Sequence, residues 1–453
     1  MPALHEDVVL WGSALLVVAA IVLPYALSFR RRNRKDRARK EEAVQLGIDR
    51  PKAQYPAIDA TRCIGCGTCV TACPEHDVLG IVGGRATVIN GLRCVGHGKC
   101  QEACPVGAIQ VGLGDLKSRD DIPLTDEWQE SSVPGLFLVG ELSGLALVKN
   151  AVAQGPRAVQ RIAQRLPRMR SGGGDAFDLV VVGSGPAGLS AAAAAKGAGL
   201  SCVVLDQEKD LGGTIFHYPR RKLVLVQPIE LPGWGRMKEG EYSKEELLAI
   251  LKEMSQRQRL HLRFGEKVES VTPVGGLFSV KTAAQVVLGR TVILALGRRG
   301  SPRMLGAPGE ERPKVLYQLL DAETYRNQHI LVVGGGDSAV EAILGLARQA
   351  GNRVSLSYRR DKLVRIKRKN AERMEALIAE GAIKTLFGSE VEEILQDRVR
   401  LRLGEKTLEI KNDHVFVFAG GEPPFALLKQ SGVRFGGEPK ACQRDAVCPA
   451  LRT

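Results

Sequence analysis

The chain has 453 residues, 44% hydrophobic and 25% charged, which is the composition of a folded protein with several domains rather than a disordered one. Its formal net charge of +14 could suit a nucleic-acid-binding protein, but residues 30–40 carry eight basic side chains and one acidic side chain, so half of the excess is local. No interleaving of aromatic and basic residues marks a nucleic-acid surface, and we expect no nucleic-acid partner.

An apolar stretch lies near the N-terminus. Residues 8–29 are 22 consecutive uncharged residues, and a helix of that length would be about 33 Å long, enough to cross a bilayer core of about 30 Å. Glu6 and Asp7 precede it and the basic run follows it, which favours an uncleaved single-pass anchor with the rest of the chain on the cytoplasmic face. A cleaved signal or a buried helix is the alternative. We predict a transmembrane anchor over 1–30 and a basic linker over 31–55.

Seven of the ten cysteines lie between positions 63 and 104, and this crowding beside C-x-x-C spacings favours metal binding over disulfides. A run of the form C-x2-C-x2-C-x3-C-P begins at Cys63 and is typical of bacterial ferredoxins; a similar run begins at Cys94. The near-repeat resembles a two-cluster ferredoxin over residues 56–112. The resemblance implies that the first cluster uses Cys63, Cys66, Cys69 and Cys104, and that the second uses Cys73, Cys94 and Cys100.

His97 stands where the second run should have its second cysteine. Three outcomes remain open: a 4Fe-4S cluster with an imidazole ligand, a 3Fe-4S cluster that lacks this corner, or no second cluster. Imidazole replaces thiolate on iron in Rieske centres, where it raises the reduction potential. Because three cysteines surround this position in the pattern, we take His97 as a candidate ligand.

Residues 177–206 predict a strand, a glycine turn, an alanine-rich helix and a second strand, which together form a dinucleotide-binding unit. Gly183 permits the tight turn, Gly185 lets a pyrophosphate approach the helix N-terminus, and Gly188 lets the helix and strand pack closely. Asp206 ends the second strand, where a carboxylate would bind a ribose hydroxyl. We expect this unit to hold a dinucleotide cofactor.

A second unit of the same kind follows downstream. Its G-x-G-x-x-A fingerprint consists of Gly334, Gly336 and Ala339. An NAD site has an acidic residue at the end of the next strand, whereas this strand ends at Arg359 and Arg360, which suit the 2′-phosphate of NADPH. We therefore expect NADPH rather than NADH.

Residues 121–165 include the sequence SSVPGLFLVGELSGLALVKNAVAQGPRAVQRI. Here the chain resembles the thioredoxin reductase-like pyridine nucleotide-disulfide oxidoreductases. In that family the corresponding segment follows the NADPH domain, but here it precedes the FAD fingerprint, so the chain resembles a circular permutation. The resemblance implies that Gly140 and Glu141 face the ribityl chain of the flavin and that Gly213 and Thr214 belong to a loop lying along the flavin.

We predict an α/β protein with two Rossmann-like dinucleotide-binding domains, one for FAD and one for NADPH, plus a small α+β ferredoxin-like iron-sulfur domain and one N-terminal transmembrane helix. The remaining predicted boundaries are 113–170 for the displaced FAD-domain segment, 171–300 for the FAD-binding domain, 301–421 for the NAD(P)H-binding domain, and 422–453 for a return to the FAD domain and a tail.

The disulfide reductases of this family carry a redox dithiol, yet residues 203–441 contain no cysteine. We therefore expect a flavoenzyme that passes electrons between NADPH, FAD and its clusters, with a redox protein or a membrane electron carrier as partner. Two alternatives stay open: a thiol-disulfide reductase that uses Cys442 and Cys448, and a membrane redox sensor or assembly subunit that does not turn over. A homodimer is also left open.

Overall fold

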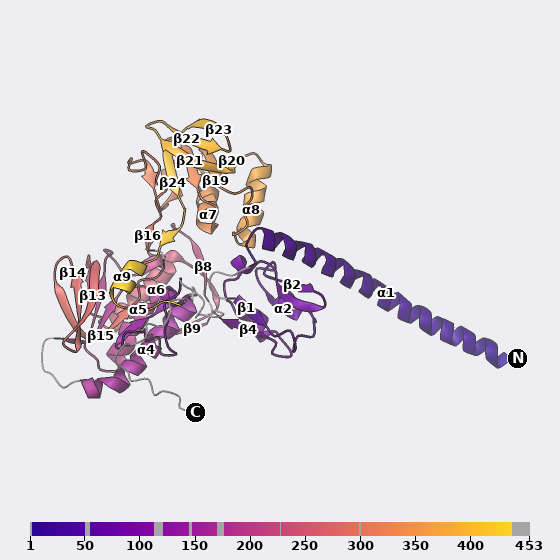
Figure 1. Ribbon diagram of the computed structural model, residues 1–453, viewed down its shortest axis with the longest axis horizontal. Helices are drawn as coiled ribbons and strands as arrows, with labels where there is room; N and C mark the ends of the chain where they lie inside the picture. Colours follow the sequence, from indigo (N-terminus) through magenta and orange to yellow (C-terminus); the bar gives the residue numbers. More distant parts are fainter. Residues whose placement is uncertain are drawn as a thin grey trace, which may run out of the picture. The chain divides into compact units, whose positions relative to one another are not determined.

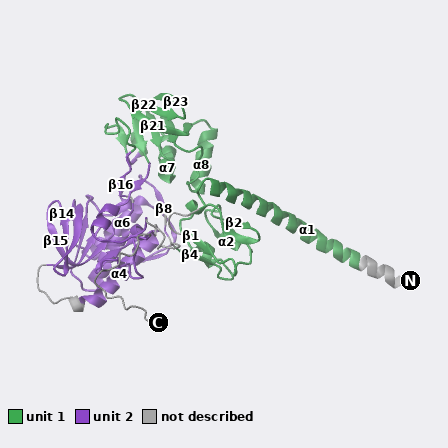
Figure 2. Ribbon diagram, viewed as in Figure 1, with its two compact units in different colours: residues 1–114, 305–316, 322–418 green, residues 115–304, 317–321, 419–453 purple. Residues whose placement is uncertain are grey.

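The computed structural model describes residues 2–49, 55–112, 121–144, 147–169, 176–226, 228–298 and 300–436. The chain folds into two compact units, which Figure 2 colours separately. The first unit comprises residues 1–114, 305–316 and 322–418, and the second comprises residues 115–304, 317–321 and 419–453. Each unit is therefore built from segments that are distant in the sequence.

One long helix, α1 (Pro2–Gln45), opens the first unit (Figure 1). It is the one helix, within the described ranges, that is long and apolar enough to cross a membrane. Trp11, Leu15 and Tyr25 are each at least 70% exposed, so the apolar part of α1 is not a buried core helix. The segment expected to be a linker, 31–55, is helical as far as Gln45, because Arg, Lys, Glu and Ala are strong helix formers.

Two β-ribbons and two short helices form the ferredoxin-like module of the first unit. Its elements are β1 (Tyr55–Ile58), α2 (Thr68–Ala72), β2 (Leu79–Val82), β3 (Arg85–Val88), the 3-10 helix η1 (Gly91–Arg93), α3 (Lys99–Glu102) and β4 (Ile109–Gly112). β1 pairs antiparallel with β4, and β2 pairs antiparallel with β3. Buried Cys69, Cys73 and Cys100 pack with Leu79 and Ile81, so the cysteines themselves make up much of this small core.

A five-stranded parallel sheet forms the nucleotide domain of the first unit, in the order β17-β24-β18-β19-β20. Its central strands are mostly buried, as is typical of parallel sheets that helices cover on both faces. A three-stranded antiparallel sheet, β21-β22-β23, accompanies it. The elements are β17 (Val315–Leu316), η5 (Ala322–Thr324), β18 (His329–Val333), α7 (Asp337–Leu346), β19 (Arg353–Tyr358), α8 (Arg368–Ala379), β20 (Ile383–Phe387), β21 (Ser389–Ile394), β22 (Arg398–Leu403), β23 (Lys406–Lys411) and β24 (His414–Val417).

A seven-stranded sheet forms the core of the second unit, in the order β12-β7-β6-β15-β14-β13, with β5 paired to β15. Its strands are β5 (Leu136–Leu138), β6 (Phe177–Val182), β7 (Cys202–Asp206), β12 (Leu262–Phe264), β13 (Val268–Val274), β14 (Leu277–Thr282) and β15 (Val286–Leu294). β5 lies parallel to β15, with Leu136 opposite Val292. Residues that precede the first glycine fingerprint therefore complete the sheet that carries it.

The helix after β5 packs closely on the helix of the first glycine fingerprint. A Cβ atom at Gly155 of α4 (Val148–Met169) would lie 2.6 Å from the backbone oxygen of Ala187 in α5 (Pro186–Gly197), so only glycine permits this approach. The other elements of the second unit are η3 (Gly140–Ser143), η4 (Gly213–Ile215), β8 (Leu223–Val226), β9 (Ile229–Leu231), β10 (Gly235–Met237), β11 (Gly240–Ser243), α6 (Lys244–Arg257), β16 (Ser301–Pro302), β25 (Gly421–Glu422) and α9 (Phe425–Gln430).

Candidate functional site

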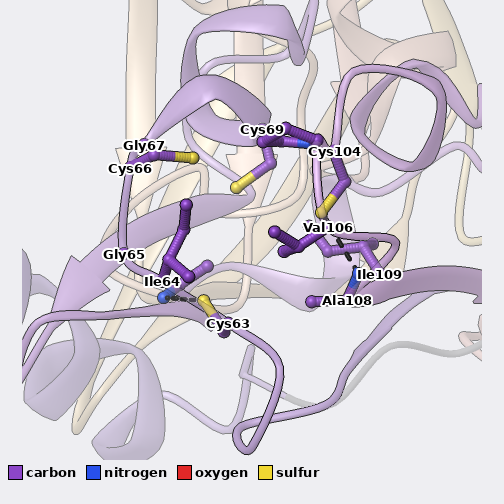
Figure 3. Close-up of a pocket in the computed structure, with 12 residues that line it drawn as sticks. Cys63, Ile64, Gly65, Cys66, Gly67, Cys69, Cys104, Val106, Ala108 and Ile109 are labelled. Carbon is purple, nitrogen blue, oxygen red and sulfur yellow. Dashed lines mark hydrogen bonds between the residues drawn. The ribbon is translucent and has the colours of Figure 1, made fainter.

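Four cysteines line the first of two pockets in the ferredoxin-like module. Cys63 and Cys66 precede α2, Cys69 lies on α2, and Cys104 follows α3. Figure 3 shows their sulfur atoms on different sides of one hollow. The backbone N–H of Ala86 donates to the sulfur of Cys63 at 3.4 Å, which is the kind of contact that stabilises a thiolate ligand.

Cys73, Cys94 and Cys100 line the second pocket together with His97. With the part that is open to solvent included, the two pockets span about 290 and 330 Å³, so they are similar in size. The structure thus brings together, in each pocket, the side chains that the ferredoxin pattern assigns to it. Cys104 from the second run joins the first pocket, as expected from the repeat.

Glycines with left-handed backbone angles shape both pockets. Gly67, with φ of 80°, precedes α2, and Gly98, with φ of 81°, precedes α3. These are conformations that other residues rarely adopt. A Cβ atom at Gly65 would lie 1.9 Å from the backbone oxygen of Gly84, so the loop of the first pocket rests directly on the β2–β3 turn.

Burial and hydrogen bonds shift the pKa values of the pocket thiols. Burial raises the pKa of the Cys69 thiol to about 11, and it raises the pKa of Cys100 to about 11 as well. Such thiols stay protonated unless a metal supplies positive charge, which deprotonates them on binding. Hydrogen bonds from Thr68 lower the pKa of Cys66.

The imidazole of His97 is half-buried at the second pocket. Burial lowers its pKa, and the positive charges of Lys367 and Lys99 lower it further. These effects favour the neutral ring, which is the form that binds metals. Within the ranges that the structure covers, no three His, Cys, Asp or Glu side chains converge on a point that would hold a single metal ion. Ligands of an iron-sulfur cluster surround a cage of several atoms instead, so the donor sets fit a cluster.

The first glycine fingerprint leaves one opening in an otherwise packed turn. A Cβ atom at Gly183 would lie 2.5 Å from the oxygen of Ala295, and one at Gly188 would lie 1.9 Å from the oxygen of Gly183. At Gly185 a Cβ atom would meet nothing closer than Gly213, at 3.8 Å. Gly183 and Gly188 therefore serve packing, whereas the space at Gly185 is open at the N-terminus of α5.

Asp206 is buried at the end of β7. Its Oδ2 atom accepts the backbone N–H of Ser184 at 2.5 Å and the hydroxyl of Ser184 at 2.6 Å, and its Oδ1 atom accepts the N–H of Glu208 at 2.9 Å. The carboxylate therefore braces the glycine turn, and Oδ1 retains a lone pair for a further donor.

In the displaced segment, polar groups of η3 form hydrogen bonds with Gln154 on α4. Gln154 accepts the N–H of Gly140 at 2.6 Å and donates to the hydroxyl of Ser143 at 2.8 Å. Burial raises the pKa of the neighbouring Glu141, and the charge of Arg298 partly offsets this effect. Thr214 lies on η4, beside the Gly213 backbone that approaches Gly185.

In the second fingerprint, too, one glycine serves packing and another leaves open space. A Cβ atom at Gly334 would lie 2.5 Å from the oxygen of Phe418, whereas Gly336 has open space at the N-terminus of α7. Ala339 is fully buried in α7. Arg359 is exposed, and Arg360 donates to the backbone oxygen of Leu46 at 3.5 Å. Of the two predicted phosphate contacts, Arg359 is therefore exposed, whereas Arg360 already has a partner.

One arginine near this site carries an unsatisfied donor. The Nε atom of Arg365 is buried and has no hydrogen-bond partner within the described chain. A buried N–H without an acceptor is costly, and Arg365 follows Arg360 by five residues in the sequence, so it is a further candidate for an anion contact.

The remaining cysteines bear on disulfide chemistry. Of the eight cysteines within the described ranges, seven line the two pockets, and the eighth is Cys202. Burial raises the pKa of Cys202 to about 12, which makes it a poor nucleophile. Cys442 and Cys448 lie outside the described residues.

Sequence reasoning missed the contacts that fix the module on α1. The N–H of Gly83 donates to Asn33 at 3.0 Å, the N–H of Ile81 donates to Asp36 at 2.9 Å, and Arg39 pairs with Asp77 at 2.6 Å. One feature of the sequence could have indicated these contacts, because Asp36 is the single acidic residue in the basic run.

Comparisons with known proteins match two parts of the chain to two families. The sequence profile of the family "Pyridine nucleotide-disulphide oxidoreductase" matches residues 180–443, and that of the "4Fe-4S dicluster domain" matches residues 55–105. Bacilliredoxin reductase Bdr of Bacillus subtilis (strain 168) is 30% identical over 265 residues, covering 57% of this chain and 81% of the relative.

Two further relatives extend the comparison. A ferredoxin–NADP reductase of Ignicoccus hospitalis is 30% identical over 276 residues, covering 58% of this chain and 83% of that protein. Among solved structures, bacillithiol disulfide reductase Bdr (YpdA) from Staphylococcus aureus aligns with a TM-score of 0.53 and 25% identity, covering 57% of this chain and 80% of that chain. The expected thioredoxin reductase-like fold and ferredoxin-like domain are confirmed.

Proposed function

Because the chain belongs to the pyridine nucleotide-disulphide oxidoreductase family and carries a 4Fe-4S ferredoxin domain, we propose that it is a membrane-anchored enzyme that moves electrons between NADPH, FAD and two iron-sulfur clusters. The clusters then exchange electrons with an external redox partner. A flavin, when bound, supplies the conversion between a hydride pair and single electrons that nicotinamide cannot perform.

The distribution of cysteines is the observation that carries this proposal. Seven of the eight described cysteines gather at two pockets, and buried Cys202 is not suited to disulfide exchange. Within the described residues, then, the candidate electron acceptors of the chain are cluster sites rather than a dithiol. A family relative is named ferredoxin–NADP reductase, which supports electron transfer to an iron-sulfur acceptor.

The chain's residues would hold the clusters as follows. Cys63, Cys66, Cys69 and Cys104 bind the first cluster through their thiolates. Cys73, Cys94, Cys100 and His97 bind the second, with the neutral imidazole of His97 at the corner where a cysteine is missing. The backbone N–H of Ala86 stabilises negative charge on the sulfur of Cys63.

The second unit would bind FAD through backbone and carboxylate groups. The open space at Gly185 admits the pyrophosphate to the N-terminus of α5, where backbone N–H groups and the helix dipole favour an anion. Asp206 accepts a ribose hydroxyl through Oδ1 while Oδ2 holds Ser184. Gln154 fixes Gly140, and Glu141 beside it faces the ribityl chain.

The nucleotide domain would bind NADPH at the N-terminus of α7, with Gly336 facing the pyrophosphate. Arg359 and Arg360 contact the 2′-phosphate, and Arg365 is a further candidate for this contact. Arg360 has to exchange its contact with Leu46 for the phosphate.

The anchor follows from α1. Its exposed apolar side chains are more stable in the hydrocarbon core of a bilayer than in water. Washing membranes with alkaline carbonate tests this part of the proposal: we expect the full chain to stay with the lipid, and release into the supernatant would contradict anchoring.

Turnover with two kinds of acceptor tests the proposed activity. Detergent-solubilised protein is given NADPH with either an oxidised bacterial ferredoxin or an aromatic disulfide. We expect the ferredoxin to be reduced and the disulfide to be left intact. Disulfide reduction that disappears in Cys442→Ser would favour the thiol-disulfide alternative, and the absence of NADPH oxidation with either acceptor would favour a sensor or assembly role.

A further inference from the structure

Three contacts fix the ferredoxin-like module along α1 in register. Asn33, Asp36 and Arg39 are spaced three residues apart, so they share one face of the helix. They meet Gly83, Ile81 and Asp77 in turn, at 3.0, 2.9 and 2.6 Å. Successive turns of the helix therefore contact points progressively farther from the β2–β3 turn, and Figure 1 shows the module beside the C-terminal part of α1.

This register sets the height of the module above a bilayer. Asn33 follows Phe29, the last residue of the apolar stretch, by four residues, which is about 6 Å along a helix. The headgroup layer on each side of a bilayer is roughly 5–7 Å thick. The β2–β3 turn that contacts Asn33 is therefore level with the lipid headgroups.

The first pocket lies at this end of the module. Its Gly65 loop rests on the oxygen of Gly84, in the same turn that contacts Asn33. Two aliphatic residues that line this pocket are exposed, Ile64 by 64% and Val106 by 38%. The mouth of the first pocket is thus apolar and near the lipid surface.

The second pocket lies toward the nucleotide domain. Arg39, which pairs with Asp77, is ten residues beyond Phe29, or about 15 Å along the helix. Asn90 donates to the backbone oxygen of Val364, and Ile48, Ile89 and Val364 are buried together. From the bilayer outward, the order is the first pocket, then the second pocket, then the nucleotide domain.

We infer that the mouth of the first pocket, defined by Ile64, Cys66 and Val106, is a docking surface for an integral membrane protein that carries a one-electron redox centre. This inference rests on the proposed function, because it requires α1 to cross a bilayer and the first pocket to hold a cluster. Cys63, Cys66, Cys69 and Cys104 would hold the cluster, which would supply one electron to the partner's centre, so that the cluster would be oxidised and the centre reduced. No bond forms or breaks, and no proton moves.

The lining of the pocket favours such a carrier over a lipid-soluble quinone. Full reduction of a quinone takes two electrons and two protons. Apart from the cysteines, the lining side chains of the first pocket are not titratable. The surface is therefore suited to a proton-free electron transfer across an apolar contact.

A photo-cross-linking residue at position 64 tests the placement without any turnover. The full-length protein is placed in nanodiscs of phosphatidylcholine and phosphatidylglycerol and illuminated. We expect lipid adducts from position 64 and from position 106, and none from position 378 on α8, where Ile378 is 38% exposed like Val106. No adduct at either pocket position, or an equal yield at position 378, would overturn the inference.

The rate of electron transfer to a membrane-tethered acceptor, compared with that to a soluble acceptor, tests whether the partner is a membrane protein. NADPH is supplied to the nanodiscs with a ferrocenium group attached either to a lipid headgroup or to a soluble carrier. We expect Ile64→Glu to lower the rate with the tethered acceptor about tenfold relative to the soluble one, because a carboxylate loses its hydration in an apolar contact. Ile378→Glu should leave the ratio unchanged, and iron counts normalise cluster content.

Three outcomes show which part of the account fails. NADPH-dependent reduction of ubiquinone in nanodiscs that Ile64→Glu abolishes would replace the protein partner with a quinone and overturn the inference. If the chain leaves the membrane in alkaline carbonate, the proposed anchoring itself fails; if it stays and position 64 gives no adduct, only the docking inference fails.

Discussion

The carboxylate of Asp36 accepts the backbone N–H of Ile81 at 2.9 Å, and this bond joins α1 to a hairpin 45 residues later in the chain. Asp36 is buried, and the same carboxylate also accepts a bond from Arg39 at 3.2 Å. The apolar helix and the ferredoxin-like module are therefore held together by side-chain contacts as well as by the chain.

Removing this carboxylate should loosen the module. In Asp36→Ala the buried N–H of Ile81 loses its acceptor, which costs about 1–3 kcal/mol. We expect a lower urea midpoint for the loss of iron-sulfur absorbance. Arg37→Ala is the matched control, because Arg37 is the exposed neighbour in sequence. Equal midpoints for the two variants would show that the bond does not hold the module.

Adding a methyl group at Gly185 should block FAD while leaving the fold intact. The space there is open, with the nearest atom 3.8 Å from a Cβ position, so the variant folds but the pyrophosphate loses its approach. We expect Gly185→Ala to weaken FAD binding at least about tenfold, or about 1.4 kcal/mol. The amount of flavin that stays with the protein during gel filtration measures FAD binding.

Gly197→Ala provides the comparison, because Gly197 is also in α5 and also has open space around it. It should keep FAD and gain about 0.5–1 kcal/mol of stability from a better helix former. Full flavin content in both variants would remove Gly185 from the binding site.

Replacing His97 should alter the second cluster only. With His97 as a ligand, the wild-type protein holds about eight iron atoms per chain and His97→Asn about seven, with a new paramagnetic signal from a three-iron cluster. His76→Asn is the control, since His76 is exposed and lines neither pocket. Unchanged iron content and spectra in His97→Asn would exclude the imidazole as a ligand.

The arginines of the nucleotide domain should distinguish NADPH from NADH. Losing one charged contact to the 2′-phosphate costs about 1.5–3 kcal/mol, so Arg359→Ala and Arg365→Ala should each raise the KM for NADPH by at least about tenfold. The KM for NADH should change little. Arg348→Ala, an exposed arginine outside the fingerprint, should affect neither nucleotide. An equal rise in the KM for NADPH and for NADH would mean that these arginines do not bind the 2′-phosphate.

Much of the fold was predictable because its motifs are local. The glycine turns at Gly183 and Gly334 require backbone conformations that few residues adopt, so their spacing identifies the two dinucleotide units. The displaced strand was found by its resemblance to a known segment, and it does pair with β15.

The sequence did not predict the contacts between distant segments. Charged residues are usually solvated, so the basic run after Phe29 predicts a linker, yet Asp36 and Arg39 form hydrogen bonds with the module. The bond between Ser184 and Asp206 was missed as well, because the same carboxylate pattern predicts only a ribose ligand. Such pairings depend on tertiary packing, which single-residue patterns do not encode.

Anaerobic titration with NADPH, followed by absorbance and paramagnetic resonance, tests the central claim most directly. We predict that NADPH bleaches the flavin bands and the broad iron-sulfur absorbance together, and that signals of reduced clusters appear. Flavin reduction in the fully iron-loaded protein without any cluster reduction would contradict the account.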